Sequence, residues 1–251
     1  TISSANHVTT RLSALALLEE PDVLETYAEY NQFMQLQGDI AKHFAAESVV
    51  LTNIHGEQIT FTVQQQSGSN LPFAFYLQML VGLLCVAVGG SIWAFQRNSA
   101  AASVYLLMGV GVALSSLCSA VYTSRELYID AEIFRGLSIV NHLGAVIFGA
   151  GLISIFWIYP QRIVNKPILI LMVFSFIPIN ISDTLQLFET TAAGHHLWCL
   201  GYTLLAFVGA GVQWRKTRGA AADRAILKWM LLSVMATTLI FVSFNIIPAA
   251  F

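Results

Sequence analysis

A set of polar side chains lies inside or at the ends of long apolar stretches of the sequence, where ionisable groups are rare. Its members are Gln78, Tyr122, Asn141, His142, Asn180, Asp183, His195, His196 and Asn245. An ionised carboxylate is strongly disfavoured in lipid, so Asp183 is expected to have a partner or to face water. Histidine titrates near neutral pH, which suits His142 to ligand capture or to proton sensing. These residues form a candidate site if the surrounding elements bring them to one level.

The elements that carry these residues are six apolar runs of the length of membrane-spanning helices. They cover 72–95, 100–123, 136–159, 166–188, 194–214 and 225–249. About 20 residues of helix cross a hydrocarbon layer about 30 Å thick, and unpaired backbone amides are not tolerated there, so each run should be helical. The chain is 56% hydrophobic and 10% charged, against about 25% charged residues in soluble domains. We expect residues 71–251 to form an all-α polytopic membrane bundle of about six transmembrane helices.

Residues 1–70 differ from the rest by their mixed composition. Apolar residues recur at helical spacing over 10–37, with a break near Pro21. Alternating residues over 49–51 and 59–63 predict two strands. Such a short segment buries too little surface for a large core of its own. We therefore expect a small α+β cap that rests either on the membrane helices or on chain outside the 251 residues.

The positions of the cations predict how the chain is oriented. Alternate breaks between the apolar runs hold eight of the twelve Lys and Arg residues: Arg97, Arg162, Lys166, Arg215, Lys216, Arg218, Arg224 and Lys228. The opposite breaks hold Arg125 and Arg135, diluted by acidic residues. By the positive-inside rule the first set is cytoplasmic, which places the N-terminal segment outside the cytoplasm. We expect a multi-pass protein of a bacterial inner (plasma) membrane.

In this orientation the polar residues gather in the half of the membrane that lies away from the cytoplasm. We hypothesise an outward-open pocket with Asp183 and His142 at its base and His196 at its rim. The other members, Gln78, Tyr122, Asn141, Asn180 and Asn245, would also line it. The alternative, that these groups sit at interfacial helix ends and pair with one another, stays open. A zinc or iron site is a third interpretation, because histidine and aspartate are suitable ligands, although no HExxH spacing is present.

Several function classes find no support in the sequence. There is no basic stripe for nucleic acid, no phosphate-binding loop, no nucleophile elbow and no cofactor motif. A small-solute transporter or channel would need polar groups through the whole membrane thickness, and the inner halves of the runs hold few. A metal-dependent membrane enzyme remains a second alternative. We expect no catalytic residue, no resident cofactor and no bound metal in this chain.

Short motifs in a fixed order resemble the membrane input region of multi-helix bacterial sensor histidine kinases, the relatives of ComP-type quorum-sensing kinases. They lie at 122–127, 134–138, 141–145, 148–150, 159–162, 213–219 and 223–225. Residues 21–33 and 49–57 are similar to the extracytoplasmic segment of these proteins, which is PDZ-like in some of them.

The resemblance implies a signal-sensing module of a two-component system. Such a module would bind an extracytoplasmic or membrane-borne signal and relay it through helix rearrangement to a cytoplasmic kinase domain of the same polypeptide. It also implies a homodimer surrounded by membrane lipid, and it names no ligand. No phosphoacceptor helix or ATP-binding motif occurs in the 251 residues, so the expected kinase would follow Phe251.

Overall fold

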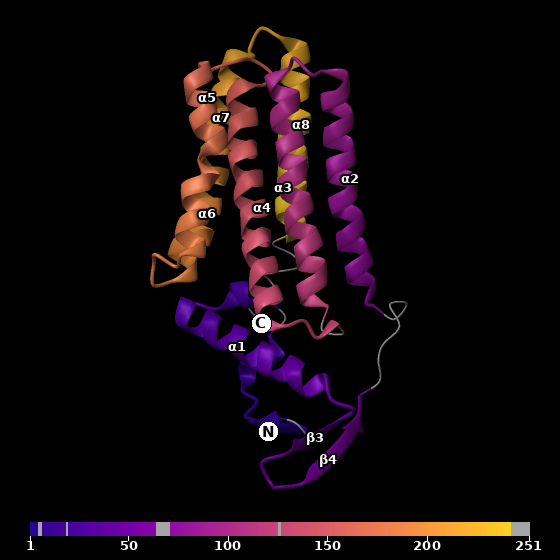
Figure 1. Ribbon diagram of the computed structural model, residues 1–251. Helices are drawn as coiled ribbons and strands as arrows, with labels where there is room; N and C mark the ends of the chain where they lie inside the picture. Colours follow the sequence, from indigo (N-terminus) through magenta and orange to yellow (C-terminus); the bar gives the residue numbers. More distant parts are fainter. Residues whose placement is uncertain (5–6, 19, 64–70, 125–126, 242–251) are drawn as a thin grey trace.

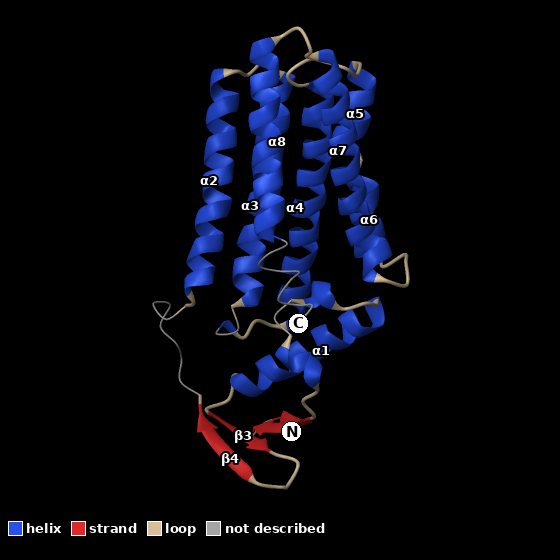
Figure 2. Ribbon diagram, turned by 180° about the vertical axis from the view of Figure 1, so that it is seen from behind, coloured by secondary structure: helices blue, strands red, loops and turns tan. Residues whose placement is uncertain are grey.

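The computed structural model describes residues 1–4, 7–18, 20–63, 71–124 and 127–241 (Figure 1). A bundle of long helices is stacked on a small cap, which we define as the described residues up to 63. Within the cap, helix α1 (Tyr27–Phe44) lies between the bundle and a small sheet. Figure 2 shows the same order from behind, with the sheet farthest from the bundle.

The sheet of the cap has four antiparallel strands among the described residues, in the order β2-β1-β3-β4. The strands are β1 (Ile2–Ser4), β2 (His7–Thr10), β3 (Ser48–Thr52) and β4 (Gln58–Thr62). The two strands predicted at 49–51 and 59–63 are confirmed as β3 and β4, which place Val50 opposite Thr60. Gly56 turns the chain between them with a φ of 83°, which a glycine adopts readily. The short strands β1 and β2 were not predicted, because three or four residues give no clear alternation.

The broken helix predicted over 10–37 is confirmed only from Tyr27 onward, and the prediction for the residues before Tyr27 is wrong. That region holds the end of β2, two short 3-10 turns and the first half of α1. The turns are η1 (Ala14–Leu17) and η2 (Pro21–Val23). Proline holds the preceding residue extended and starts a new turn. Helix α1 then begins at Tyr27 because Thr26 and Glu29 form a capping box, each side chain accepting from the other residue's backbone amide at 3.2 Å.

The bundle consists of helices α2 to α8. Their bounds are α2 (Phe73–Phe95), α3 (Ala100–Thr123), α4 (Ala131–Ile158), α5 (Lys166–Phe174), α6 (Phe176–Thr184), the π-helical turn η5 (Ala192–His196), α7 (Leu197–Lys216) and α8 (Ala221–Phe241). Five helical spans among the described residues are long and apolar enough to cross a membrane: Phe73–Phe95, Ala100–Thr123, Ala131–Ile158, Lys166–Thr184 and Ala192–Lys216. The sixth predicted run, 225–249, is described only as far as Phe241, so the count of six stays a prediction.

The predicted runs at 136–159 and 166–188 differ from the observed helices in where they begin, divide or end. The run at 136–159 begins earlier, as α4, because the Asp130 side chain caps the backbone amide of Glu132 at 2.8 Å. The run at 166–188 is divided into α5 and α6 and ends at Thr184. Pro178 explains the division, since its ring excludes a helical bond to the carbonyl four residues earlier, at Phe174.

Helix α4 is the centre of the bundle. It packs against α3, α5, α6 and α7, and α1 of the cap contacts it from below in Figure 1. The outer helices α2 and α7 expose long rows of large apolar side chains, for example Leu80, Leu83 and Leu84 on α2. Water-soluble monomers rarely expose apolar surface on this scale. The structure therefore has the architecture of a multi-pass membrane protein with a small cap at one end.

The loops rich in cations lie together at one end of the bundle. The connections α2–α3, α4–α5 and α7–α8 are at the end remote from the cap, and the eight clustered Lys and Arg residues lie in these connections or in the adjoining ends of the helices (Figure 1). The cap and the cations are thus separated by the full length of the apolar helices, as the sequence predicts.

Candidate functional site

The cap is held against the bundle by an apolar contact and by a buried polar one. In the apolar contact, Phe33 and Met34 of α1 pack with Tyr122 of α3 and Phe134 of α4. The rings of Phe33 and Phe134 meet edge to face with centroids 5.5 Å apart. All four side chains are almost completely buried. The expectation that the N-terminal segment rests on the membrane helices is met by this cluster.

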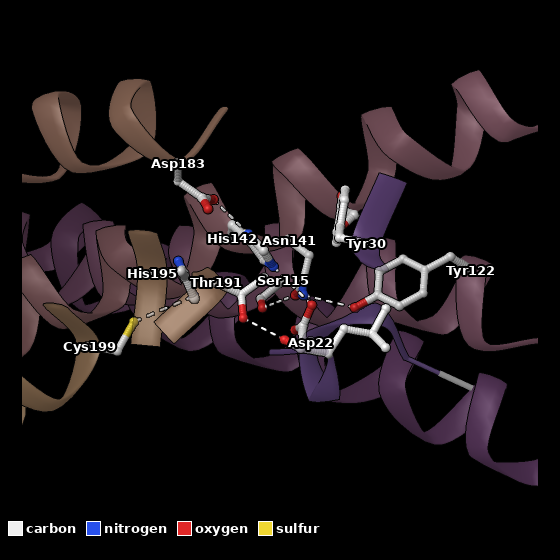
Figure 3. A network of polar contacts seen from close by, with 12 residues as sticks. Asp22, Tyr30, Ser115, Tyr122, Asn141, His142, Asp183, Thr191, His195 and Cys199 are labelled. Carbon is white, nitrogen blue, oxygen red and sulfur yellow. Dashed lines mark hydrogen bonds and ion pairs between the residues drawn. The ribbon is translucent and has the colours of Figure 1, made fainter. Parts of the chain in front are cut away.

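The polar contact is centred on His142 of α4 (Figure 3). Its Nδ1 lies 2.7 Å from Asp183 Oδ2 of α6, and its Nε2 lies 3.0 Å from Asp22 Oδ1 of the cap. Carboxylates accept hydrogen bonds, so both ring nitrogens donate, as they do in the doubly protonated ring. We call Asp22, His142 and Asp183 the His142 bridge, since it connects the cap to two separate helices of the bundle.

Helix α1 adds a fourth group to the bridge. The Tyr27 hydroxyl donates to Asp183 Oδ1, so the two oxygens of this carboxylate have different partners. Burial opposes the charge of Asp22, but the hydrogen bond and the charge of His142 outweigh it and lower the pKa of the Asp22 carboxyl. Burial and the Asp183 carboxylate raise the pKa of the Tyr27 phenol. At neutral pH Asp22 is therefore ionised, and Tyr27 remains a hydrogen-bond donor.

The connection between α6 and α7 holds the N-terminal end of α1 by backbone hydrogen bonds. The Thr191 amide donates to the Glu25 carbonyl at 3.1 Å, and the Tyr27 amide donates to the Glu189 carbonyl at 3.3 Å. The Thr191 hydroxyl also donates to the Leu24 carbonyl at 2.5 Å. These bonds hold the start of α1 against the ends of α6 and α7 that lie nearest the cap.

The π-helical turn η5 places His195 inside this region and His196 outside it. The His195 ring stacks on His142 with centroids 4.2 Å apart and an angle of 18° between the planes. Its Nε2 lies 3.5 Å from Cys199 Sγ, and its buried Nδ1 has no hydrogen-bond partner among the described residues. His196, predicted at the rim, is exposed, and its ring makes a T-shaped contact with the His195 ring. Turns of the π type are frequent at functional sites.

A second group of predicted residues lines a cavity of about 570 Å³ beside the bridge. The lining includes Gln78, Ser115, Ser116, Tyr122, Asn141, Phe148, Thr203 and, from the cap, Glu20. The Asn141 amide donates to the Tyr122 hydroxyl at 2.8 Å and accepts from the Ser115 hydroxyl. Among the described residues, Gln78 Oε1 and Ser116 Oγ are buried without a hydrogen-bond partner. The cavity therefore offers unpaired polar atoms within a mainly apolar wall.

The structure divides the predicted site residues between these two places. His142 and Asp183 belong to the bridge, whereas Gln78, Tyr122 and Asn141 line the cavity. Asn180 of α6 joins neither group, and its buried Nδ2 has no partner among the described residues. Asn245 lies outside the described residues.

The sequence did not indicate the contributions of the cap to the site. Asp22 is distant in sequence from its partner and stands beside a proline in a polar segment, where a surface turn is the ordinary expectation. Tyr27 is equally remote from Asp183 along the chain. A pairing across so many residues leaves no local pattern, and the one available signal was the need of Asp183 for a partner.

In comparisons with family models, curated proteins and solved structures, this chain has no match.

Proposed function

We propose that this chain is the signal-input module of a transmembrane receptor. The change that it transmits is the docking of the cap on the bundle or its release. The observation that carries the proposal is the His142 bridge. A buried ion pair adds little net stability, but removing one partner is costly, because the other charge remains buried. A contact of this kind favours two discrete states, docked and released, and an element with two discrete states is what a switch requires.

Contacts along α4 and α7 support a path from the bridge to the opposite end of the bundle. The Trp157 indole nitrogen donates to the Leu205 carbonyl at 3.2 Å. At the far end the buried Gln213 donates to the Gln161 carbonyl at 2.5 Å, and Gln161 donates to Asp223 of α8 at 2.9 Å. A shift of α4 or α7 at the cap would therefore move groups that are fixed to the start of α8.

The cavity supports a small amphipathic molecule as the signal, received from outside the cell or from the lipid. Its volume of about 570 Å³ lies in the range of small-molecule sites, about 300–1,000 Å³. Asn141 couples the cavity to the His142 bridge, because it lines the cavity and immediately precedes His142 in α4. A ligand that pairs with Asn141 would act directly on α4, the helix that carries His142.

We assign the cap to the extracytoplasmic side of a bacterial inner membrane, because the clustered cations lie at the other end of the helices. Single cysteines introduced at Asn53 in the cap and at Arg218 in the α7–α8 connection, with the native cysteines replaced by alanine, test this assignment. In intact cells an impermeant maleimide should label the first and spare the second. Labelling of the second position alone would reverse the assignment, and equal labelling of both would contradict their placement on opposite sides.

The resemblance to sensor histidine kinases supports two further parts of the proposal: a cytoplasmic kinase domain after Phe251 in the same polypeptide, and a homodimer. The coding sequence downstream of Phe251 tests the first part, since a stop codon there would exclude it. Cross-linking of the full-length protein in native membranes tests the second, and a monomeric band at every cross-linker concentration would exclude it.

Removing the cap's carboxylate from the bridge tests the proposed relay. In lipid nanodiscs, Asp22→Ala should change hydrogen–deuterium exchange at the α7–α8 connection. There the Thr217 amide donates to the Gln213 carbonyl at 2.9 Å and the Ala220 amide to the Thr217 carbonyl at 3.0 Å. Allosteric coupling of the usual size changes an equilibrium constant by about 5- to 150-fold. Here the equilibrium is the opening of these amide hydrogen bonds, which the exchange rate measures.

The matched control for this experiment is Asp39→Ala. Asp39 is an exposed carboxylate of the same cap and forms an ion pair with Lys42 at 3.0 Å, so its loss should leave the α7–α8 connection unchanged. Equal exchange at Thr217 and Ala220 in the wild type and in Asp22→Ala would refute the relay.

A further inference from the structure

Three buried side chains of the junction between cap and bundle form a set of metal ligands. His142, Asp183 and His195 come from α4, α6 and η5, and each offers a ligand atom within 4.8 Å of the others. They are 7%, 5% and 6% exposed. Ligand atoms on a tetrahedral zinc ion lie about 3.3 Å apart, given bonds of about 2.0–2.1 Å. Small side-chain shifts would bring the three atoms to that spacing.

The unpaired nitrogen of His195 is an independent observation that points to a ligand. A buried imidazole nitrogen without a partner is unfavourable, and most such groups in folded proteins are satisfied. His195 Nδ1 has no partner among the described residues, while the other ring nitrogen faces Cys199. Figure 3 shows the ring between Cys199 on one side and the His142–Asp183 pair on the other. A cation bound between His195 and Asp183 would satisfy the free nitrogen.

The partners of these ligands resemble the outer shell of a metal site. A metal-bound histidine almost always donates its other ring nitrogen to a carboxylate, a carbonyl or water, and a metal-bound carboxylate is itself hydrogen-bonded. His142 Nε2 already faces Asp22 at 3.0 Å, and the second oxygen of Asp183 accepts from Tyr27. Both supporting groups come from the cap, so binding of a cation would be linked to docking of the cap.

We propose that His142 Nδ1, the Asp183 carboxylate and an imidazole nitrogen of His195 bind one zinc-class divalent cation at this junction. Two imidazoles and one carboxylate suit zinc and its borderline neighbours such as cobalt, whereas calcium and magnesium prefer oxygen ligands alone. The ion takes the place of the proton between His142 and Asp183, and that proton leaves for solvent, as metal binding to histidine requires. Three protein ligands leave a fourth position for water or substrate.

The test uses the chelator-treated chain in lipid nanodiscs, titrated with zinc and separately with cobalt. We expect one ion per chain by elemental analysis after desalting, and visible cobalt absorption of the intensity that four-coordinate sites give. His195→Ala should abolish both signals. His196→Ala is the matched control, because it removes the exposed neighbour in the same turn, and it should bind as the wild type does.

A second variant separates the loss of a ligand from a general loss of structure. Asp22→Asn keeps all three proposed ligands and alters the group that supports His142, so it should weaken zinc binding by about 10- to 100-fold. Equal binding by the wild type and His195→Ala, or failure of the wild type to retain an ion, would overturn the proposal. Neither result depends on signalling, so the metal site and the receptor function can fail separately.

Discussion

Replacing Asp183 by alanine is expected to release the cap from the bundle. The change leaves the Tyr27 hydroxyl and His142 Nδ1 without their acceptor inside a buried site. Removing one partner of a buried ion pair destabilises by about 3–5 kcal/mol. We therefore expect the amides of α1 to exchange with deuterium at least about 100-fold faster than in the wild type, since 1.4 kcal/mol corresponds to a factor of ten. Mass spectrometry of peptides from 27–44, with the chain in lipid nanodiscs, measures the change.

Two other variants separate this effect from a general loss of structure. Asp39→Ala removes an exposed carboxylate from α1 itself and should leave exchange in that helix unchanged. Asp183→Asn keeps the size of the side chain and an oxygen for Tyr27 but loses the charge that faces His142. It should therefore lie between alanine and the wild type. Unchanged protection of α1 in Asp183→Ala would mean that the apolar cluster around Phe33 is sufficient to hold the cap.

Gly194→Ala is expected to release the cap by a steric route. A Cβ atom at this position in η5 would overlap the Tyr27 hydroxyl oxygen and would lie 2.8 Å from the ring carbon that carries it. Tyr27 would have to leave its place beside Asp183, because Thr191, the residue before the turn, is held by the bonds from its amide to Glu25 and from its hydroxyl to Leu24. Forcing an extra methyl group into a packed site usually costs about 1–3 kcal/mol. Exchange in α1 should accelerate accordingly, by about 5- to 100-fold.

Gly201→Ala provides the matched control, because no described atom lies within 4 Å of a Cβ at that position in α7. It should not change exchange in α1. The combination of Gly194→Ala with Tyr27→Phe should be less damaging than the sum of the two changes, since both act on the same hydroxyl. Strict additivity would show that Gly194 acts through another contact.

The sequence predicted the bundle well because its signal is local. An apolar run of about 20 residues specifies a helix wherever it occurs in lipid, and α2 and α3 match their predicted runs almost to the residue. The break between α5 and α6 follows from Pro178. The partner that Asp183 requires was also foreseeable, and His142 provides it. The strands β3 and β4 were visible from simple alternation.

The rest of the site depends on contacts that no local pattern records. Asp22 and Tyr27 reach the bridge only through the docking of the cap, which brings distant parts of the chain together. The choice between His195 and His196 depends on the π-helical turn. A regular helix has 3.6 residues per turn, and the wider turn changes which of the two neighbouring side chains faces inward. Even a correct prediction of all the helices would have left this choice open.

A covalent tether between cap and bundle tests the central claim most directly. Phe44 of α1 and Tyr128 before α4 stack with ring centroids 4.2 Å apart. Cysteines at both positions, with the native cysteines replaced by alanine, can be joined by a short bifunctional maleimide. In the Asp183→Ala background, the tether should return exchange at Thr217 and Ala220 to the wild-type rate, because the far end responds to the position of the cap. If exchange there stays altered while the cap is fixed in place, the far end responds to local damage around Asp183, and the receptor account fails.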